Sequence, residues 1–207
     1  GQHRLMAIVE ADMPVQMWVY RGLQTEDIRV IDTHGVRTDQ NALWIDGLEV
    51  DNKDVATAKA MSFSIKSHTG YSSMGRDELH AYIVRHKQAI EFVAEHLRSC
   101  DKGVRHSCVA AVVARAWYTV DHDRLAEFCQ VLCDGVTDNR ENFAAQRLRN
   151  WLQLSTSGSG TSSQRSVIYR KTESALRAFL ERRDVTKLYE VSREEFPLPE
   201  EIDADGH

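Results

Sequence analysis

The sequence lacks several features that would assign the protein to a specialised class. None of its apolar runs approaches the ~18 residues that a membrane span needs, and no basic stretch followed by an apolar one suggests a secretory signal. Four cysteines in 207 residues are too few for a disulfide scaffold. A net charge of −5 gives no general affinity for nucleic acid, although a local basic patch is compatible with it. We therefore expect a soluble, cytoplasmic protein with no membrane partner.

The remaining composition is that of an ordinary globular protein. Hydrophobic residues make up 42% and charged residues 28%, and the length suits one large domain or two small ones. The cysteines, all in helical-looking sequence, are expected to be reduced core thiols: Cys100, Cys108, Cys129 and Cys133. Cys129 and Cys133 with nearby His122 form a weak candidate metal set, but no paired ligands follow at finger-like spacing, so no metal site is predicted.

From residue 51 onward the apolar residues recur with the 3.6-residue period of helices. Asp51 or Asn52 can cap the first helix, and Asp121 is expected to cap the helix over 122–134. The segment His106–Val120 is apolar around nearly its whole circumference, which predicts a central buried helix. The expected helices are 52–66, Asp77–Ser99, His106–Val120, 122–134 ended by Gly135, 139–154 and Gln164–Arg183.

The first fifty residues show a different pattern. A helix is expected over 3–11 and ends before Pro14, because proline disfavours helix in the residue before it. Val15–Tyr20 is rich in β-forming residues and predicts a strand, and residues 25–32, capped by Thr25, predict a short helix.

The chain opens with the motif Gly1-Gln2-His3-Arg4, within the pattern G-x-x-R-x-x-A. A glycine before a helix lets an anion approach the backbone closely. The helix start offers free N–H groups and a partial positive charge. Arg4 can bind a phosphate through two hydrogen bonds, and His3 can donate another. These residues predict a phosphate or nucleotide site.

The motif also resembles known families. Gly1-Gln2-His3-Arg4 looks like the end of the D-G-Q-H-R motif of DndB-like proteins, and it is similar to boxes in the ParB N-terminal domain and in sulfiredoxins. The resemblance covers residues 1–23 and implies a nucleoside triphosphate, CTP or ATP, with any Mg bound through the nucleotide. Gln2 stands where sulfiredoxin has its catalytic cysteine, so sulfinic-acid reduction is not expected.

The same resemblance predicts where this chain sits in such a protein. The aspartate and the strands that normally precede the glycine are not in the sequence, so residues 1–50 are expected to be the C-terminal part of a ParB/DGQHR-like domain. The stretch from Asp32-Thr33 to Arg37-Thr38 and the tail Glu195-Phe196-Pro197 look like segments of uncharacterised phage and actinobacterial proteins with this domain.

Three functions remain open from the sequence. The first is a nucleotide-responsive DNA-binding or regulatory protein of a phage or mobile element. The second is a ParB-like small-molecule kinase, for which Glu10 and Asp32 are the nearby candidate bases, although neither lies in a recognisable motif and the catalytic residues are unknown. The third is a structural helical interaction protein. No Walker loop, nucleophile elbow or serine-histidine-aspartate signature is visible.

The last predicted helix carries a series of basic residues that could follow the phosphates of DNA: Arg165, Arg170, Lys171 and Arg177. A solvated face with salt-bridge partners is the slightly favoured interpretation, because glutamates are interspersed. A second basic and aromatic cluster, equally ambiguous, consists of Arg140, Arg147, Arg149 and Trp151.

The predicted fold is mainly α: a truncated α/β ParB-like segment followed by an all-helical bundle domain. The expected divisions are 1–50, a helical domain over 51–191, and an acidic tail over 192–207 that packs poorly. A homo-oligomer is compatible with this sequence, which does not determine the oligomeric state.

Overall fold

The computed structural model describes residues 2–24, 38–63, 74–155 and 161–199, and its regular secondary structure there is helical. The predicted mainly helical character is therefore confirmed. The chain divides into a first unit, Gly1–Arg37, and a second unit, Thr38–His207. The division lies upstream of residue 50 because helix α3 (Asp39–Ile45) packs against the next two helices of the second unit.

The first unit contains α1 (Gln2–Ala11), as predicted, followed by an extended segment. The helix ends where Asp12 takes a positive φ of 46°, two residues before Pro14. The prediction of a strand at Val15–Tyr20 is not met: the segment is extended but pairs with no other described residue. A strand needs a partner strand for its backbone hydrogen bonds, and β-forming composition alone does not supply one. The predicted helix over 25–32 lies outside the described residues.

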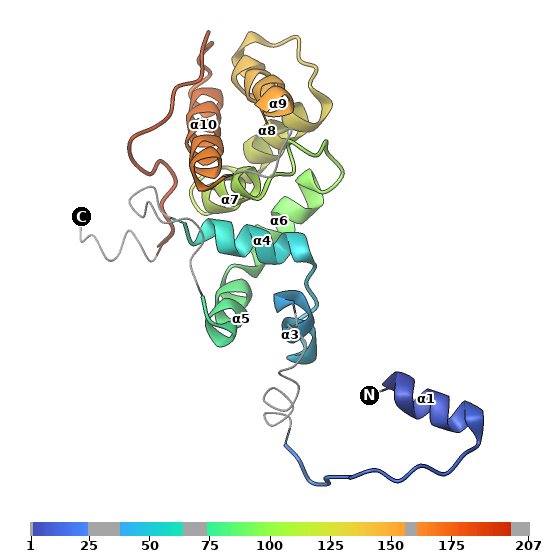
Figure 1. Cartoon of the computed structure of the whole chain (residues 1–207). Helices are drawn as coiled ribbons and strands as arrows, with labels where there is room; N and C mark the ends of the chain where they lie inside the picture. Colours follow the sequence, from blue (N-terminus) through green and yellow to red (C-terminus); the bar gives the residue numbers. More distant parts are fainter. Residues whose placement is uncertain (1, 25–37, 64–73, 156–160, 200–207) are drawn as a thin grey trace. The chain divides into compact units, whose positions relative to one another are not determined.

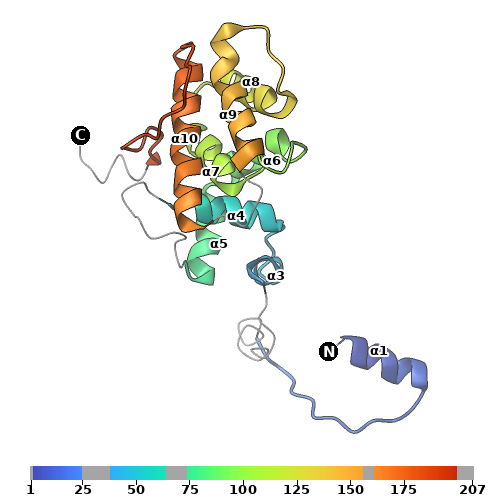
Figure 2. The same ribbon diagram turned by 45° about the horizontal axis from the view of Figure 1, so that its top comes forward.

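The second unit is a helical bundle, shown in two views (Figures 1 and 2). After α3 its elements are α4 (Asn52–Met61), α5 (Arg76–Arg85), α6 (Lys87–Leu97), α7 (Ser107–Ala116), α8 (His122–Asp134), a 3₁₀ turn (Arg140–Asn142), α9 (Phe143–Ser155) and α10 (Ser162–Leu180).

Local signals determine several helix ends. Asp51 caps α4 in a full capping box with Asp54, and Asp121 caps α8 through the Arg124 N–H. Gly135 ends α8 with a left-handed φ of 71°, a conformation that glycine adopts without steric cost. These three ends are where the sequence predicts them.

The sequence predicts one continuous helix over Asp77–Ser99, and this prediction is wrong. The structure has two helices there, α5 and α6, which are separated at His86. His86 has φ −101° and ψ 18°, outside the helical range, and its buried ring hydrogen-bonds the Tyr118 hydroxyl at 2.7 Å. A tertiary contact 32 residues away thus accompanies the break.

Helix α7 forms the core of the bundle, as predicted. Every residue from Cys108 to Ala116 is buried. The helix packs against α4, α6 and α10, and Figure 2 shows it in the middle of these elements. An apolar circumference requires neighbours on all sides, and this arrangement supplies them.

Two further predictions are wrong. Cys100 and Cys133 are not reduced thiols but form a disulfide, because the packing of α6 against α8 brings their Cα atoms to 4.8 Å. The described part of the tail is not poorly packed, since Phe196 and Leu198 are only 6% and 2% exposed. None of the helices within the described ranges combines the length and the hydropathy that a membrane span requires.

Candidate functional site

The predicted phosphate motif lies at the start of α1. The helix begins at Gln2, directly after Gly1, and its first turn carries no acidic residue. His3 and Arg4 are both exposed. Gly1 and the side chain of Gln2 lie outside what the structure describes. The helix therefore presents its positive end together with an accessible guanidinium and an accessible imidazole.

The same unit exposes an unusual amount of apolar surface. Trp18 is 92% exposed and Val9 79%. Large apolar side chains are exposed throughout α1 and the extended segment: Leu5, Met6, Val9, Met13, Val15, Met17, Trp18, Val19, Tyr20 and Leu23. Such concentrations of exposed apolar surface mark interaction sites in soluble proteins.

Of the two candidate kinase bases, only Glu10 falls within the described residues. It is exposed on α1, almost two turns after Arg4. Asp32 lies outside the described residues.

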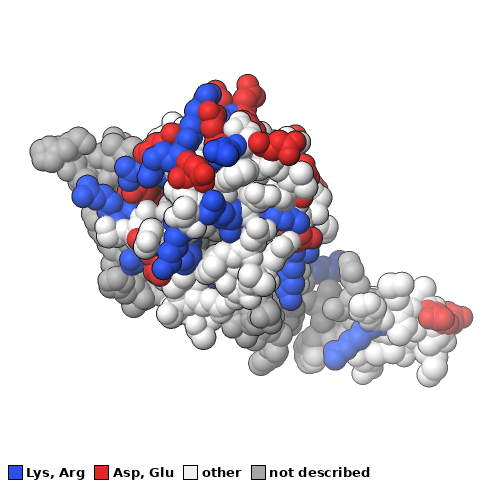
Figure 3. Space-filling view, turned by 90° about the horizontal axis from the view of Figure 1, so that it is seen from above, with Lys and Arg blue, Asp and Glu red and all other residues white. Residues whose placement is uncertain are grey.

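The basic residues of α10 are largely committed to contacts within the chain. Arg170 donates to the Val191 carbonyl at 3.4 Å, and Lys171 donates to the Leu188 carbonyl at 2.8 Å. Arg177 pairs with Glu181 at 2.9 Å and with Glu195 at 2.8 Å. Figure 3 shows basic and acidic side chains interspersed over one face of the bundle. Of the two interpretations of this helix, the arrangement fits a solvated face with salt-bridge partners better than a continuous basic surface for DNA phosphates.

The second basic cluster is similarly engaged. Arg149 pairs with Asp101 at 2.6 Å and donates to the Leu132 carbonyl at 2.6 Å. Arg147 pairs with Asp184 at 3.3 Å. The sequence predicts that these arginines lie on one helix. In the structure, Arg147 and Arg149 form ion pairs with acidic residues of other segments.

The sequence did not predict a buried polar cluster beneath the C-terminal segment. Arg115 of α7 is fully buried, and its Nε lies 3.0 Å from the Phe196 carbonyl and 3.2 Å from a Glu194 carboxylate oxygen. Its Nη1 donates to the Met61 carbonyl at 2.7 Å. The Tyr169 hydroxyl donates to Glu194 at 2.5 Å. One arginine thus connects α4, α7 and the C-terminal segment.

Glu173 of α10 completes this cluster. Its side chain is fully buried, and one carboxyl oxygen accepts the Glu195 N–H at 3.2 Å. The other oxygen has no hydrogen-bond partner among the described residues. Burial, and then the negative charge of neighbouring Glu194, raise the pKa of Glu173 to about 9. The side chain is therefore a neutral acid at pH 7.

This titration predicts a pH dependence of stability. The folded-state pKa is raised from an ordinary value of 4.5, so the stabilising contribution is complete below pH 4.5 and is lost as the pH rises toward 9. We expect the wild-type free energy of unfolding to fall between pH 7 and 8.5, by at most about 1.4 kcal/mol per pH unit. Glu173→Gln should remove most of this fall. Urea unfolding at four pH values gives the free energy of unfolding of both proteins. The same pH dependence in the wild type and in Glu173→Gln would contradict this prediction.

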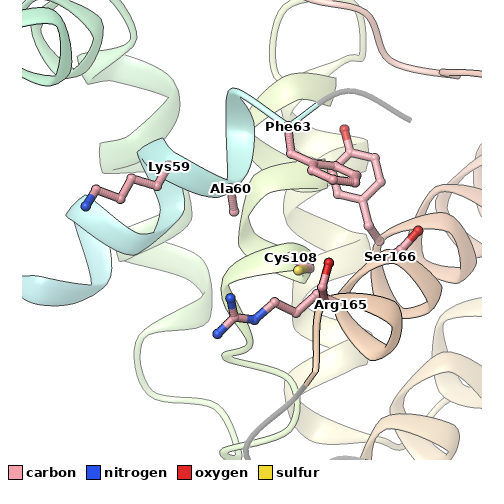
Figure 4. Close-up of a pocket in the computed structure, with 8 residues that line it drawn as sticks. Lys59, Ala60, Phe63, Cys108, Arg165 and Ser166 are labelled. Atoms are coloured by element: carbon pink, nitrogen blue, oxygen red, sulfur yellow. The ribbon is translucent and has the colours of Figure 1, made fainter. Parts of the chain in front are cut away.

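A small cavity between α4, α7 and α10 does not qualify as a nucleotide site. Figure 4 shows Ala60, Phe63, Cys108 and Arg165 around it, with Lys59 extending away from the others. Its volume of about 20 Å³ holds about one water molecule. Burial raises the pKa of the Cys108 thiol to about 12, so this thiol is a poor nucleophile at neutral pH.

Two clefts of about 540 Å³ lie on the surface of the bundle. One is bounded by α4, α5 and α6, and includes Lys87 and Arg98. The other, between α6 and α8, is rich in carboxylates and includes Cys133. No set of three or more candidate metal ligands occurs within the described ranges. The residues that line both clefts belong to the second unit.

No protein-family model, curated protein or solved structure matches the chain. Any assignment of function therefore rests on the residues described above.

Proposed function

We propose that this chain belongs to a nucleotide-responsive regulatory protein of ParB/DndB-like type, in which Gly1, Gln2, His3 and Arg4 bind the phosphates of a nucleoside triphosphate. The observation that carries the proposal is the start of α1 at Gln2, which puts the motif at the positive end of a helix. The guanidinium of Arg4, in the first turn of the helix, is exposed there. Its forked donors suit phosphate oxygens better than the point charge of lysine does.

The first unit also supports the regulatory form of the proposal. Its exposed apolar side chains make residues 2–24 a surface for packing against other polypeptide. In a complete ParB-like α/β domain, the extended residues 15–20 would gain a neighbouring strand. Binding of a nucleotide at one end of α1 would then be linked to the packing of the rest of this segment.

Arg4→Ala is expected to abolish nucleotide binding without unfolding the protein. Arg4 is exposed and lies outside the second unit, so its loss removes phosphate contacts without opening the bundle core. Calorimetric titration of CTP and ATP in the presence of Mg²⁺ measures the effect. Arg21→Ala, another exposed arginine of the first unit, is the matched control. Equal nucleotide binding by wild type and Arg4→Ala would refute the site.

The DNA-binding alternative is tested separately. Arg170, Lys171 and Arg177 already contact partners within the chain. We therefore expect the triple alanine variant to have the same affinity for labelled duplex DNA as the wild type. Fluorescence anisotropy titrations over a salt series measure this affinity. A weaker affinity, with a salt dependence flatter by roughly one unit of slope per lost phosphate contact, would favour the DNA-binding form instead.

A further inference from the structure

Residues 188–198, here called the strap, lie against the bundle as a peptide would lie in a groove. Side chains of the bundle donate hydrogen bonds to three strap carbonyls, those of Leu188, Val191 and Phe196. The donors are Lys171, Arg170 and Arg115 respectively. Recognition of an extended backbone by fixed side-chain donors is typical of peptide-binding sites.

The side chains of the strap are recognised as specifically as its backbone. Glu194 contacts Arg115 and accepts from the Tyr169 hydroxyl. Glu195 pairs with Arg177. Phe196 and Leu198 are buried against the bundle, at positions on either side of Pro197. The sequence Glu-Glu-Phe-Pro-Leu thus meets a cation or an apolar pocket at each position except the proline.

The groove contains two buried polar side chains that hydrogen-bond to the strap, Arg115 and Glu173. Arg115 and Glu173 are fully buried, and both use strap atoms as hydrogen-bond partners. Apolar side chains of similar size at these positions would give a core of equal or greater stability. Buried polar groups that take some of their hydrogen bonds from one short segment favour that segment over sequences that would leave them unpaired.

The strap is joined to the bundle by an exposed linker. Helix α10 ends at Leu180, and the residues from Glu181 to Asp184 are exposed, as are Thr186 and Lys187. Between its anchors, Tyr189 and Glu190 are exposed too. The linker keeps the strap at a high effective concentration, on the order of millimolar, and contributes only the half-buried Val185 to the core.

We propose that the groove formed by Arg115, Tyr169, Glu173 and Arg177 is a peptide-docking site that the chain's own strap occupies, and that it accepts in trans an extended acidic peptide of Glu-Glu-aromatic-Pro-aliphatic chemistry. The chemistry of the partner follows from the strap contacts. Two cations face two carboxylates, and the apolar pockets follow on the carboxyl-terminal side. The strap is then an autoinhibitory occupant, and a partner peptide displaces it.

The test uses the full chain and a fluorescein-labelled peptide with the sequence of residues 188–199. Phe196→Ala removes one buried anchor of the strap, so it should relieve the competition in cis and tighten peptide binding by about tenfold or more. In that background Arg177→Glu places a negative charge against the peptide carboxylate at position 195 and should weaken binding at least about fivefold. Arg183→Glu, an equal charge change in the exposed linker, should not.

Anisotropy titrations give the affinities, and a thermal melt accompanies each variant. The proposal would be overturned if the wild type and Phe196→Ala bound the peptide with equal affinity, or if neither bound it. So would an Arg177→Glu variant that binds as tightly as the Arg183→Glu control. A Phe196→Ala protein that no longer folds would show that the strap is a permanent part of the core, which also overturns it.

Discussion

Ala111→Asp is expected to destabilise the protein by at least about 3 kcal/mol, and thus to remove a large part of an ordinary folding free energy. Ala111 is fully buried in α7, the helix with neighbours in α4, α6 and α10. A carboxylate there would lose its hydration, and the residues around it are mainly apolar. Because Ala111 has no exposed surface, a larger side chain would also have to displace its neighbours.

The matched control is Ala81→Asp, the same change at an exposed position of helix α5. Chemical unfolding of both variants and the wild type measures the difference. Comparable losses of stability in the two variants, or a melt of Ala111→Asp that matches the wild type, would show that α7 is not the core of the bundle.

Arg115→Ala is expected to cost about 3–5 kcal/mol, the range for removing one partner of a buried ion pair. The change would leave the Met61 and Phe196 carbonyls without their arginine donor, and Glu194 without its buried cation. It would also leave a cavity the size of a long side chain, because Arg115 is fully buried.

Arg183→Ala serves as the comparison, because this arginine pairs with Glu181 on the surface and such pairs contribute little. Urea unfolding at pH 7 gives both values. A double-mutant cycle with Glu194→Gln separates the ion pair from the lost packing. An Arg115→Ala protein as stable as the Arg183→Ala protein would mean that the cluster contributes nothing to holding the strap.

Features that depend on neighbours in sequence could be predicted without the structure. The caps at Asp51 and Asp121 and the glycine that ends α8 act within one turn of the helix they delimit. The burial of α7 follows from its apolar circumference, since no exposed helix tolerates one. The start of α1 beside the Gly1–Arg4 motif was predicted in the same way, and the role of that motif in phosphate binding stays a prediction.

Features that depend on residues far apart in the chain were decided only by the tertiary structure. The break at His86 accompanies a contact with Tyr118, and the disulfide joins cysteines separated by 33 residues. Arg115 meets Phe196 across 81 residues. In the sequence, Arg115 is an isolated charge in an apolar helix, and the acidic tail is typical of a solvated segment. The two segments meet only when the chain folds, and the hydrogen bonds between them then compensate for the water that each loses, so neither segment alone contains the signal.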